Sequence, residues 1–286
     1  MAIPRSTLAA SALALTAALV AASCGSLAFT AANLPAHFGD FERRADLAYG
    51  SLERQTLDVY VPDGARDRPI IMFWYGGGWE NGSKADYRFV GATLAKAGYV
   101  VVLPDYRLYP EVKFPAFVDD GAAALAWVAQ HAREIGGDPQ RLYLAGHSAG
   151  AHLAAMLAYD PARLERVGLR REVVRGFIGL SGPYALDPNS DILNAIFAAP
   201  YRLSDWQPAQ LAAAGAPPAL LLHGEDDTTV DVSHARRMAE KLQSVGVPVT
   251  LRTYPGRGHR DTVAAFAGLA PRKLPVLEEI RRFVGE

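Results

Sequence analysis

The sequence predicts an α/β fold, a doubly wound and mostly parallel sheet with helices on both faces. Apolar runs of strand length alternate along the chain with runs of helical period, as in repeated strand–helix–strand units. Several strand-like runs are apolar throughout, which is typical of strands buried on both faces of a parallel sheet. Hydrophobic residues make up 50% of the 286 residues, so the chain can bury a large core. Functional groups are then expected at the carboxyl ends of the strands.

The period of the hydrophobic residues, together with the glycines and prolines that end most of the runs, predicts the helices and strands in order. Strands are predicted at residues 47–49, 55–61, 69–75, 99–104, 142–145, 177–180, 219–223 and 249–254. Helices are predicted at residues 87–97, 117–132, 151–158, 232–245 and 276–284. Gly98 and Gly246 directly follow two of these helices, a position where glycine commonly ends a helix. Residues 26–46 show no clear period, and we expect them to wrap over the surface.

One segment interrupts the alternation. Residues 181–216 are rich in proline and glycine and carry scattered aromatic residues such as Tyr184, Phe197 and Trp206. We predict that residues 25–286 form a single domain in which residues 181–216 are a small lid over the edge of the sheet.

The first 24 residues resemble a targeting signal. Arg5 supplies a weak positive region, and residues 8–22 form an uncharged Ala/Leu run that is too short for a comfortable membrane span. The run ends just before Cys24, the only cysteine, as in a bacterial lipobox, although Ala21 stands where leucine is usual. A secretory signal cleaved near Ala22, with Cys24 incidental, is the alternative.

Either interpretation of this signal predicts a protein exported from a bacterial cytoplasm. It would be periplasmic, or tethered to a membrane through a lipidated Cys24. A single cysteine cannot form an internal disulfide, so the core must hold the fold together.

The charge pattern and the motifs exclude some function classes. The formal net charge is −1, from 29 basic and 30 acidic residues, and no basic run stands out, so nucleic acid is not an expected partner. The sequence shows neither metal-ligand spacing nor a dinucleotide fingerprint, and we expect no metal and no cofactor. The oligomeric state is not predicted.

A serine lies at the apex of a predicted strand–turn–helix unit, in Gly146-His147-Ser148-Ala149-Gly150. This is the pattern of a nucleophile elbow, in which a strained turn holds the serine hydroxyl clear of the backbone. Glycines at both flanks leave room for the neighbouring strand and helix. A glycine-rich turn with a capping serine is the alternative interpretation.

A second glycine-rich segment directly follows the buried strand 69–75. Gly76, Gly77 and Gly78 precede Trp79 and the helix that comes next. Such a loop can point backbone N–H groups at a ligand without interference from side chains. A flexible loop is the alternative, but elements at both ends anchor this one, and we predict a ligand-binding loop.

A serine hydroxyl needs a histidine base, and the base needs a carboxylate to orient it. On this scaffold the carboxylate and then the histidine should follow the serine along the chain. His259 lies in a glycine-rich loop after the last strand, where an imidazole can lean over the sheet, and we assign it as the base. Three other histidines follow the elbow. We expect His152 to lack the geometry to reach back along its helix, His223 to be structural, and His234 to be solvated.

The carboxylate is expected in the loop after strand 219–223. This loop contains Glu225, Asp226 and Asp227, and the pattern His-Gly-x-x-Asp-x-x-Val singles out Asp227 as the partner of the base. By loop position and order alone, Glu225 and Asp226 stay geometrically possible. A solvated acidic turn is the non-catalytic interpretation.

Together these motifs resemble the α/β-hydrolase superfamily, and most closely the esterase/lipase branch related to hormone-sensitive lipase and the small bacterial carboxylesterases. The resemblance covers about residues 55–284. Its motifs, in the family's order, are Gly76-Gly77-Gly78-Trp79, Asp105-Tyr106-Arg107-Leu108, Phe114-Pro115-Ala116, Gly146-His147-Ser148-Ala149-Gly150, His223-Gly224-Glu225-Asp226-Asp227 and Gly258-His259.

The resemblance implies an α/β-hydrolase fold and an oxyanion hole formed by the N–H groups of Gly77, Gly78 and Ala149. Two features depart from the family pattern. Tyr75 stands where the family has a histidine before the glycines, a position that holds the loop and carries no proton. The large N-terminal helical cap of many lipase-like members is absent, so no acyl-chain preference is implied.

The predicted function is that of a serine carboxylesterase that hydrolyses short-chain acyl esters, because a minimal lid leaves an open and modest pocket. Carbohydrate acetyl or feruloyl esterases and arylformamidases share the loop and the elbow and are alternatives, although export argues against a cytosolic formamidase. A non-catalytic binding protein is disfavoured because all three members of a serine–histidine–aspartate triad are present. No feature of the sequence favours a peptidase.

Overall fold

The computed structural model describes residues 29–34, 39–187, 190–268 and 274–285. The predicted signal at residues 1–24, with Cys24 as its lipidation site, lies outside the described residues, so export and lipidation stay predictions. Within the described ranges, no helix is long and apolar enough to cross a membrane.

An eight-stranded sheet forms the centre of the molecule, in the order β1-β2-β4-β3-β5-β6-β7-β8. The strands are β1 Phe41–Ala48, β2 Thr56–Pro62, β3 Arg68–Trp74, β4 Val100–Pro104, β5 Gly137–His147, β6 Gly176–Leu180, β7 Ala219–Gly224 and β8 Val249–Tyr254. The pairs β1–β2 and β2–β4 are antiparallel, and the remaining neighbours pair parallel. The predicted mostly parallel sheet is confirmed.

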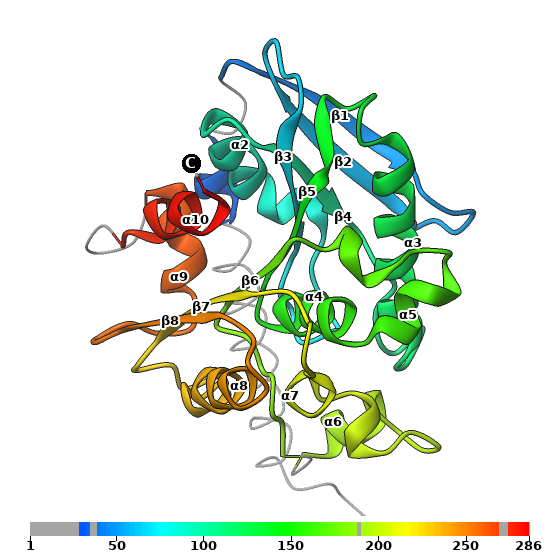
Figure 1. Cartoon of the computed structure of the whole chain (residues 1–286), viewed down its shortest axis with the longest axis vertical. Coiled ribbons are helices and arrows are strands. Elements are labelled where there is room, and N and C mark those ends of the chain that lie inside the picture. The colour runs from blue at the N-terminus through cyan, green and yellow to red at the C-terminus, as the bar shows by residue number, and fades with distance from the viewer. Residues whose placement is uncertain (1–28, 35–38, 188–189, 269–273, 286) are drawn as a thin grey trace, which may run out of the picture.

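Helices cover both faces of this sheet (Figure 1). The α-helices are α2 Arg88–Lys96, α3 Ala116–His131, α4 Ala149–Tyr159, α5 Pro161–Arg166, α6 Asp191–Ile196, α7 Pro208–Leu211, α8 Ser233–Ser244, α9 Asp261–Ala264 and α10 Val276–Val284. The 3₁₀ turns are η2 Lys84–Tyr87, η3 Arg171–Val173, η4 Leu203–Asp205 and η5 Ala265–Ala267. Helices α3, α4, α7 and α8 contact one another in succession along one face, while α2, α9 and α10 gather around η5 on the other. The structure thus has the predicted doubly wound architecture.

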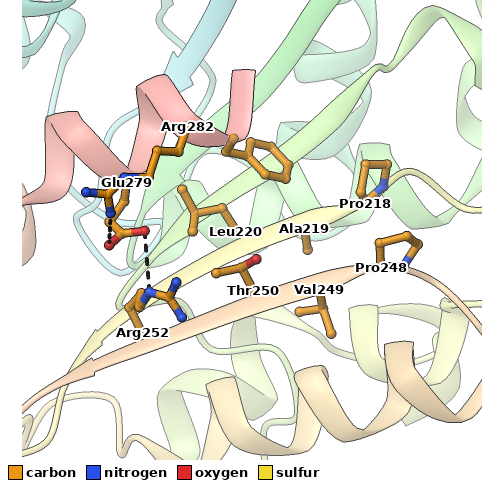
Figure 2. A pocket seen from close by; sticks show the side chains of 10 residues that line it. Pro218, Ala219, Leu220, Pro248, Val249, Thr250, Arg252, Glu279 and Arg282 are labelled. Atoms are coloured by element: carbon orange, nitrogen blue, oxygen red, sulfur yellow. Dashed lines mark hydrogen bonds and ion pairs between the residues drawn. The ribbon is translucent and has the colours of Figure 1, made fainter. Parts of the chain in front are cut away.

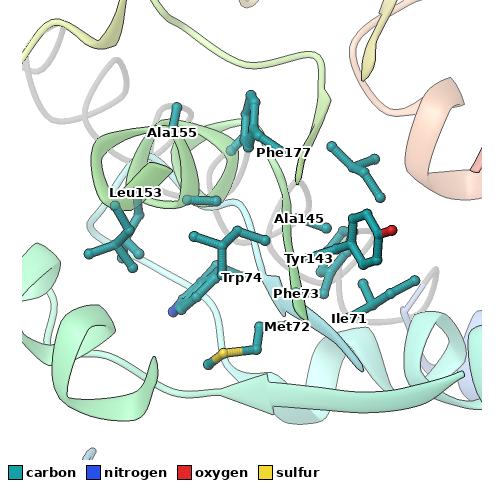
Figure 3. Packing of buried hydrophobic residues seen from close by; sticks show 14 of the residues in the cluster. Ile71, Met72, Phe73, Trp74, Tyr143, Ala145, Leu153, Ala155 and Phe177 are labelled. Atoms are coloured by element: carbon teal, nitrogen blue, oxygen red, sulfur yellow. The ribbon is translucent and has the colours of Figure 1, made fainter. Parts of the chain in front are cut away.

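The core is built on the central strands, which are apolar on both faces. Along β3, Met72 and Trp74 lie on the side of the sheet that carries Leu153 of α4, whereas Ile71 and Phe73 lie on the other side (Figure 3). All four β3 side chains are fully or almost fully buried. Successive strand residues point to opposite faces, so an uninterrupted apolar run is what a strand covered by helices on both faces requires.

The expectation for residues 26–46 was partly wrong. Residues 41–48 form the edge strand β1, which pairs antiparallel with β2. The strand is half-exposed or exposed along its whole length, so its residues need not alternate between apolar and polar. A register shift between Arg44 and Leu47, with Asp46 at φ 56°, further breaks the period of two.

The segment predicted as a small lid, residues 181–216, connects β6 to β7 and carries α6, η4 and α7. Helix α7 packs against α4 and α8. At the end of α6, the carbonyl of Ile196 accepts a hydrogen bond of 2.9 Å from the N–H of Phe114, in the loop after β4. The insertion therefore contacts loops at the carboxyl ends of the strands.

A buried ion cluster fixes the antiparallel edge of the sheet. Asp58 on β2 is fully buried, and its carboxylate accepts hydrogen bonds from Arg43 at 2.6 and 2.9 Å and from Lys84 Nζ at 2.8 Å. Lys84 Nζ also donates to the carboxylate of Asp46, and the Lys84 N–H donates to Asp105 at 2.8 Å. The cluster thereby holds η2, which follows the glycine loop, against β1 and β2.

Replacing Asp58 with asparagine should strongly destabilise the fold, because Arg43 and Lys84 would lose the charge that compensates them. Removing one partner of a buried ion pair costs about 3–5 kcal/mol of unfolding free energy. Urea denaturation measures this change.

Asp67→Asn is the matched control, because its pair with Arg133 spans 3.3 Å and the two side chains are 72% and 74% exposed. Asp67→Asn should change the free energy of unfolding by no more than about 0.5 kcal/mol. Equal effects of the two substitutions would contradict the assignment of the cluster.

Candidate active site

Ser148 occupies a sharp turn between β5 and α4. Its backbone has φ 54° and ψ −124°, a conformation that costs free energy for any residue with a side chain. A Cβ atom on Gly146 would lie 2.4 Å from the carbonyl oxygen of Gly150, and one on Gly150 would lie 2.1 Å from that of Trp74. Glycine is therefore required at both flanks, because the two flanks pack against each other and Gly150 also packs against the end of β3.

The structure brings the predicted nucleophile, base and acid into one hydrogen-bonded chain. His259 Nε2 lies 2.8 Å from Ser148 Oγ, and His259 Nδ1 lies 2.8 Å from Asp227 Oδ2. A neutral imidazole with its proton on Nδ1 satisfies both contacts, since the serine O–H then donates to Nε2 and Nδ1–H donates to the carboxylate. The three side chains come from the turn after β5, the loop after β7 and the loop after β8.

Both oxygens of the Asp227 carboxylate have hydrogen-bond donors around them. Oδ1 accepts from the N–H groups of Thr229 and Val230 at 2.9 and 2.8 Å, and Oδ2 lies 3.2 Å from His223 Nε2 as well as near His259. Burial on its own would raise the pKa of Asp227, but the hydrogen bonds from His223, His259 and Val230 outweigh it and hold the pKa well below its usual range. The carboxylate is therefore an anion that can orient and stabilise an imidazolium.

The structure resolves the choice among the three acidic residues of this loop. Glu225 and Asp226 are exposed, and Glu225 accepts a hydrogen bond from Thr253 Oγ1 at 2.6 Å. Asp227 alone of the three is buried and faces His259. The geometry therefore selects the residue that the sequence pattern favoured.

The remaining histidines after the elbow have other partners. His152 is buried on α4 and donates from Nε2 to the carbonyl of Trp206 at 2.7 Å, and burial lowers its pKa to about 4. His223 is buried, and its Nε2–H is shared between the carbonyl of Val230 at 2.8 Å and the Asp227 carboxylate at 3.2 Å, which fits a structural role. The expectation of a solvated His234 was wrong. Its ring is half-buried and accepts from the Ala185 N–H at 3.3 Å, and burial lowers its pKa to about 4.

The glycine loop offers free backbone donors beside the elbow. Gly77 and Gly78 have φ of 143° and 65°, and the carbonyl of Gly77 accepts from Glu80 and Asn81, which closes the turn. Within the described part of the chain, the N–H groups of Gly77, Gly78 and Ala149 donate to no protein acceptor. They are therefore available to an oxygen bound at Ser148.

Tyr75, which replaces the family's histidine, anchors this loop through its own contacts. Its hydroxyl accepts a hydrogen bond from Arg54 Nη2 at 2.8 Å, and its ring stacks on Tyr106 with centroids 4.5 Å apart. Arg54 also donates to the carbonyls of Gly82 and Tyr106, both at 2.8 Å. The tyrosine thus occupies a supporting position, and burial raises the pKa of its hydroxyl, which keeps its proton.

Two residues without a role in the sequence-based prediction lie beneath the candidate site. The His147 ring lies between Tyr87 and the loop of His259, with the two imidazole centroids 4.9 Å apart. Burial and the neighbouring His259 lower the pKa of His147 to about 3, so its ring is neutral in ordinary buffers. The only signal in the sequence was a histidine at the variable position of the elbow.

Aromatic rings fill the space between the glycine loop and the first turns of α4. Trp79 packs edge-on against His152 and Phe197, with centroids 5.1 and 5.0 Å apart, and Phe197 stacks on Trp206 at 4.5 Å. Phe197 and Trp206 belong to the insertion after β6, so the insertion closes one side of the candidate site.

A separate hollow lies far from this site. A cavity of about 530 Å³ is lined by residues of β7, β8 and α10, among them Pro218 and Pro248, which precede the two strands (Figure 2). Arg252 and Arg282 both pair with Glu279 at its rim. This cavity lies at the amino ends of the strands, opposite the elbow. Among the described residues, no group of three or more His, Cys, Asp or Glu side chains could hold a metal ion.

Comparison with known proteins gives matches along most of the chain. Residues 57–172 match the BD-FAE family, and residues 190–272 match the prolyl oligopeptidase family. The chain is 30% identical to isoprenylcysteine alpha-carbonyl methylesterase ICME of Arabidopsis thaliana over 79% of its own length. It spans only 58% of that protein, and similarly about half of the other plant methylesterases that it matches.

Solved esterase structures share the fold. A carbohydrate esterase from gut microbiota superposes with a TM-score of 0.76 over 86% of this chain and 96% of the other, at 22% identity. Esterase 2 of Thermogutta terrifontis gives a TM-score of 0.71 over 85% of this chain and 92% of the other, at 27% identity. The same esterase 2 has been solved with butyrate and with propionate bound.

Stability should fall as the pH is lowered from about 6.5 towards 4. The pKa values of His147, His152 and His234 are lowered to about 3, 4 and 4 by burial, whereas unfolding returns each to about 6.5. In this window the unfolded chain binds more protons than the folded chain, so the free energy of unfolding decreases with falling pH. Urea denaturation at several pH values measures the slope.

His152→Gln should reduce the slope of the unfolding free energy against pH by the equivalent of about one bound proton, because one of the three buried imidazoles is removed. An unfolding free energy that is constant between neutral pH and pH 5 would contradict neutral, buried imidazoles.

Proposed function

Since the chain belongs to the α/β-hydrolase family of carboxylesterases, we propose that it is a serine esterase that hydrolyses short-chain acyl esters. The observation that carries this proposal is the chain from Ser148 Oγ through His259 to Asp227, with 2.8 Å at each contact. A nucleophile, a base within hydrogen-bond reach and a carboxylate that orients the base are the parts that acyl transfer needs.

In the first step, Ser148 Oγ attacks the ester carbonyl carbon while His259 Nε2 takes the hydroxyl proton. The carbonyl oxygen becomes an oxyanion, for which the free N–H groups of Gly77, Gly78 and Ala149 are the proposed donors. Each such donor is typically worth about 3–4 kcal/mol of transition-state stabilisation. The anionic Asp227 stabilises the imidazolium that forms.

In the second step, the tetrahedral intermediate collapses and its C–O bond to the alcohol breaks. The imidazolium gives its proton to the departing oxygen, which leaves an acyl group on Ser148 and a neutral His259. Water then attacks the acyl carbon, His259 accepts its proton, and the same sequence releases the carboxylic acid and restores the serine.

The preference for short acyl chains is supported by the aromatic cluster beside the glycine loop. Trp79, His152 and Phe197 fill the space on that side of the elbow, which limits the depth available to an acyl chain. The similar esterase 2 with bound propionate and butyrate gives independent support. Since the chain spans little more than half of the plant methylesterases, the substrates of those larger proteins are not transferred to it.

Hydrolysis of a p-nitrophenyl ester series should show the highest kcat/KM for acetate, propionate or butyrate and a much lower value for octanoate. Ser148→Ala should abolish turnover at every chain length. Phe197→Ala should shift the preference towards longer chains, because it opens the space that the ring fills beside Trp79.

A preference for octanoate in the wild-type protein would contradict the short-chain proposal. Folded wild-type protein that hydrolyses none of these esters, or Ser148→Ala with full activity, would contradict the esterase proposal itself.

The two glycines of the proposed oxyanion hole should respond differently to alanine. A Cβ on Gly77 would lie 2.0 Å from the carbonyl oxygen of Asn81, so the loop must move, whereas a Cβ on Gly78 would meet only Glu80 Oε2 at 3.8 Å. We expect Gly77→Ala to lower kcat/KM on the order of 100-fold through misplaced donors. We expect Gly78→Ala to cost less than about tenfold, because its φ of 65° is tolerated by alanine at a modest cost. Full activity of Gly77→Ala would argue against the donor role of this loop.

A further inference from the structure

We propose that His147 and Tyr87 are positioning residues, which together lock the loop of His259 to the glycine loop and so set the base and the oxyanion donors in one geometry. The inference rests on the proposed esterase function for its kinetic consequences. Its structural content, a relay of hydrogen bonds between three segments, stands on the contacts alone.

The first contact of the relay fixes the backbone of the base. His147 Nε2 lies 3.0 Å from the carbonyl oxygen of His259, so Nε2–H donates to the main chain of the residue whose side chain faces Ser148. Among the described residues, no other hydrogen bond to this carbonyl exists. His259 is thus held twice, by its ring nitrogen on Asp227 and by its carbonyl on His147.

The second contact fixes the proton on the correct nitrogen of His147. The Tyr87 hydroxyl lies 3.0 Å from His147 Nδ1 and 3.2 Å from the Gly76 N–H. The tyrosine oxygen accepts from Gly76, so its own proton is free to donate to Nδ1. Nδ1 can accept the tyrosine proton only if it carries no proton itself. The imidazole proton is therefore on Nε2, which faces the carbonyl of His259.

The charge state of the relay suits its place beside the base. The His147 ring is buried and lies 4.9 Å from the imidazole that becomes positive during acyl transfer. A second cation there would oppose that charge, and the lowered pKa of His147 keeps its ring neutral. The relay can therefore hold the loop without competing for the proton.

The loop that carries the base needs such an anchor because glycines surround it. Gly256 has φ 69°, and Gly258 immediately precedes His259. The N–H of Gly258 donates to Asp261 at 2.8 Å within the same loop, and the carbonyl of Arg257 accepts from the N–H of Asp226, in the loop after β7, at 2.9 Å. The bond from His147 ties the main chain of this loop to the elbow, in addition to the side-chain contact between His259 and Ser148.

Steady-state kinetics on a p-nitrophenyl ester would test the relay in three variants. Tyr87→Phe removes one oxygen and keeps the ring, and we expect kcat to fall on the order of tenfold with KM within about twofold, since neither residue touches the substrate. His147→Leu should lower kcat on the order of 10- to 100-fold. His147→Gln, which keeps a donor at the end of its side chain, should recover kcat to within about threefold of the wild type.

Proton NMR gives a second measurement that does not depend on turnover. The Nδ1–H of His259, bonded to Asp227, should give a low-field resonance in the wild type and in His147→Gln. It should broaden in Tyr87→Phe and His147→Leu, because a loosened loop exposes that proton to exchange with water. Should His147→Leu not fold, Tyr87→Phe carries the test by itself.

Tyr159→Phe is the matched control. Tyr159 is equally buried, its ring packs edge-on against Phe177, and within the described residues its hydroxyl has no hydrogen-bond partner. Its kinetics and its low-field resonance should match the wild type.

Wild-type kcat and an unchanged resonance in Tyr87→Phe and His147→Leu would overturn the relay, as would a His147→Gln variant no better than His147→Leu. A failure of the esterase proposal would look different. The wild-type protein would then show no turnover, but it would still give the resonance of the bonded His259, and this resonance would still broaden in Tyr87→Phe and His147→Leu.

Discussion

The close approach of the elbow to the end of β3 is the constraint on which the site depends. A Cβ on Gly150 would lie 2.1 Å from the carbonyl oxygen of Trp74, so α4 can begin where it does only because that position lacks a side chain. Ser148 has its strained backbone at this same turn, and a Cβ on Gly76 would lie 3.0 Å from Ser148 Cβ, so the elbow also adjoins the glycine loop. Strain at this turn is maintained by the buried strands around it, which cannot relax without losing their packing.

Hydrogen bonds between loops, rather than contacts within any one loop, give the candidate site its geometry. The proposed base, acid and nucleophile come from three connections at the carboxyl ends of parallel strands. Asp227 keeps a buried negative charge because four donors surround it. The neighbouring His147 ring stays neutral because burial disfavours its charged form. The imidazole of His259 therefore lies between a fixed anion and a neutral dipole, which suits a base that becomes positive during the reaction.

The glycine loop shows that a backbone geometry can be kept while its supporting side chain changes. Tyr75 replaces the histidine usual in the family, and its hydroxyl is held by Arg54, which also binds the carbonyls of Gly82 and Tyr106. For the proposed acyl transfer, the important property of this loop is the direction in which its backbone N–H groups point. A side chain that packs beneath the loop and finds a partner for its polar end keeps that direction as well as a histidine does.

The sequence by itself determined the parallel sheet, the elbow at Ser148 and the order of the site segments, because period, glycine spacing and motif order are local properties of a chain. It predicted only the end of the edge strand β1, at residues 47–49, because the strand is half-exposed or exposed along its length and so leaves no hydrophobic period. The sequence pattern favoured Asp227 but left Glu225 and Asp226 possible, and the tertiary structure decided that Asp227 faces His259, because that contact depends on burial and direction across 32 residues of separation. The contact between His147 and the carbonyl of His259 was beyond the sequence, since it joins a side chain to a main-chain atom 112 residues away, which no residue type specifies.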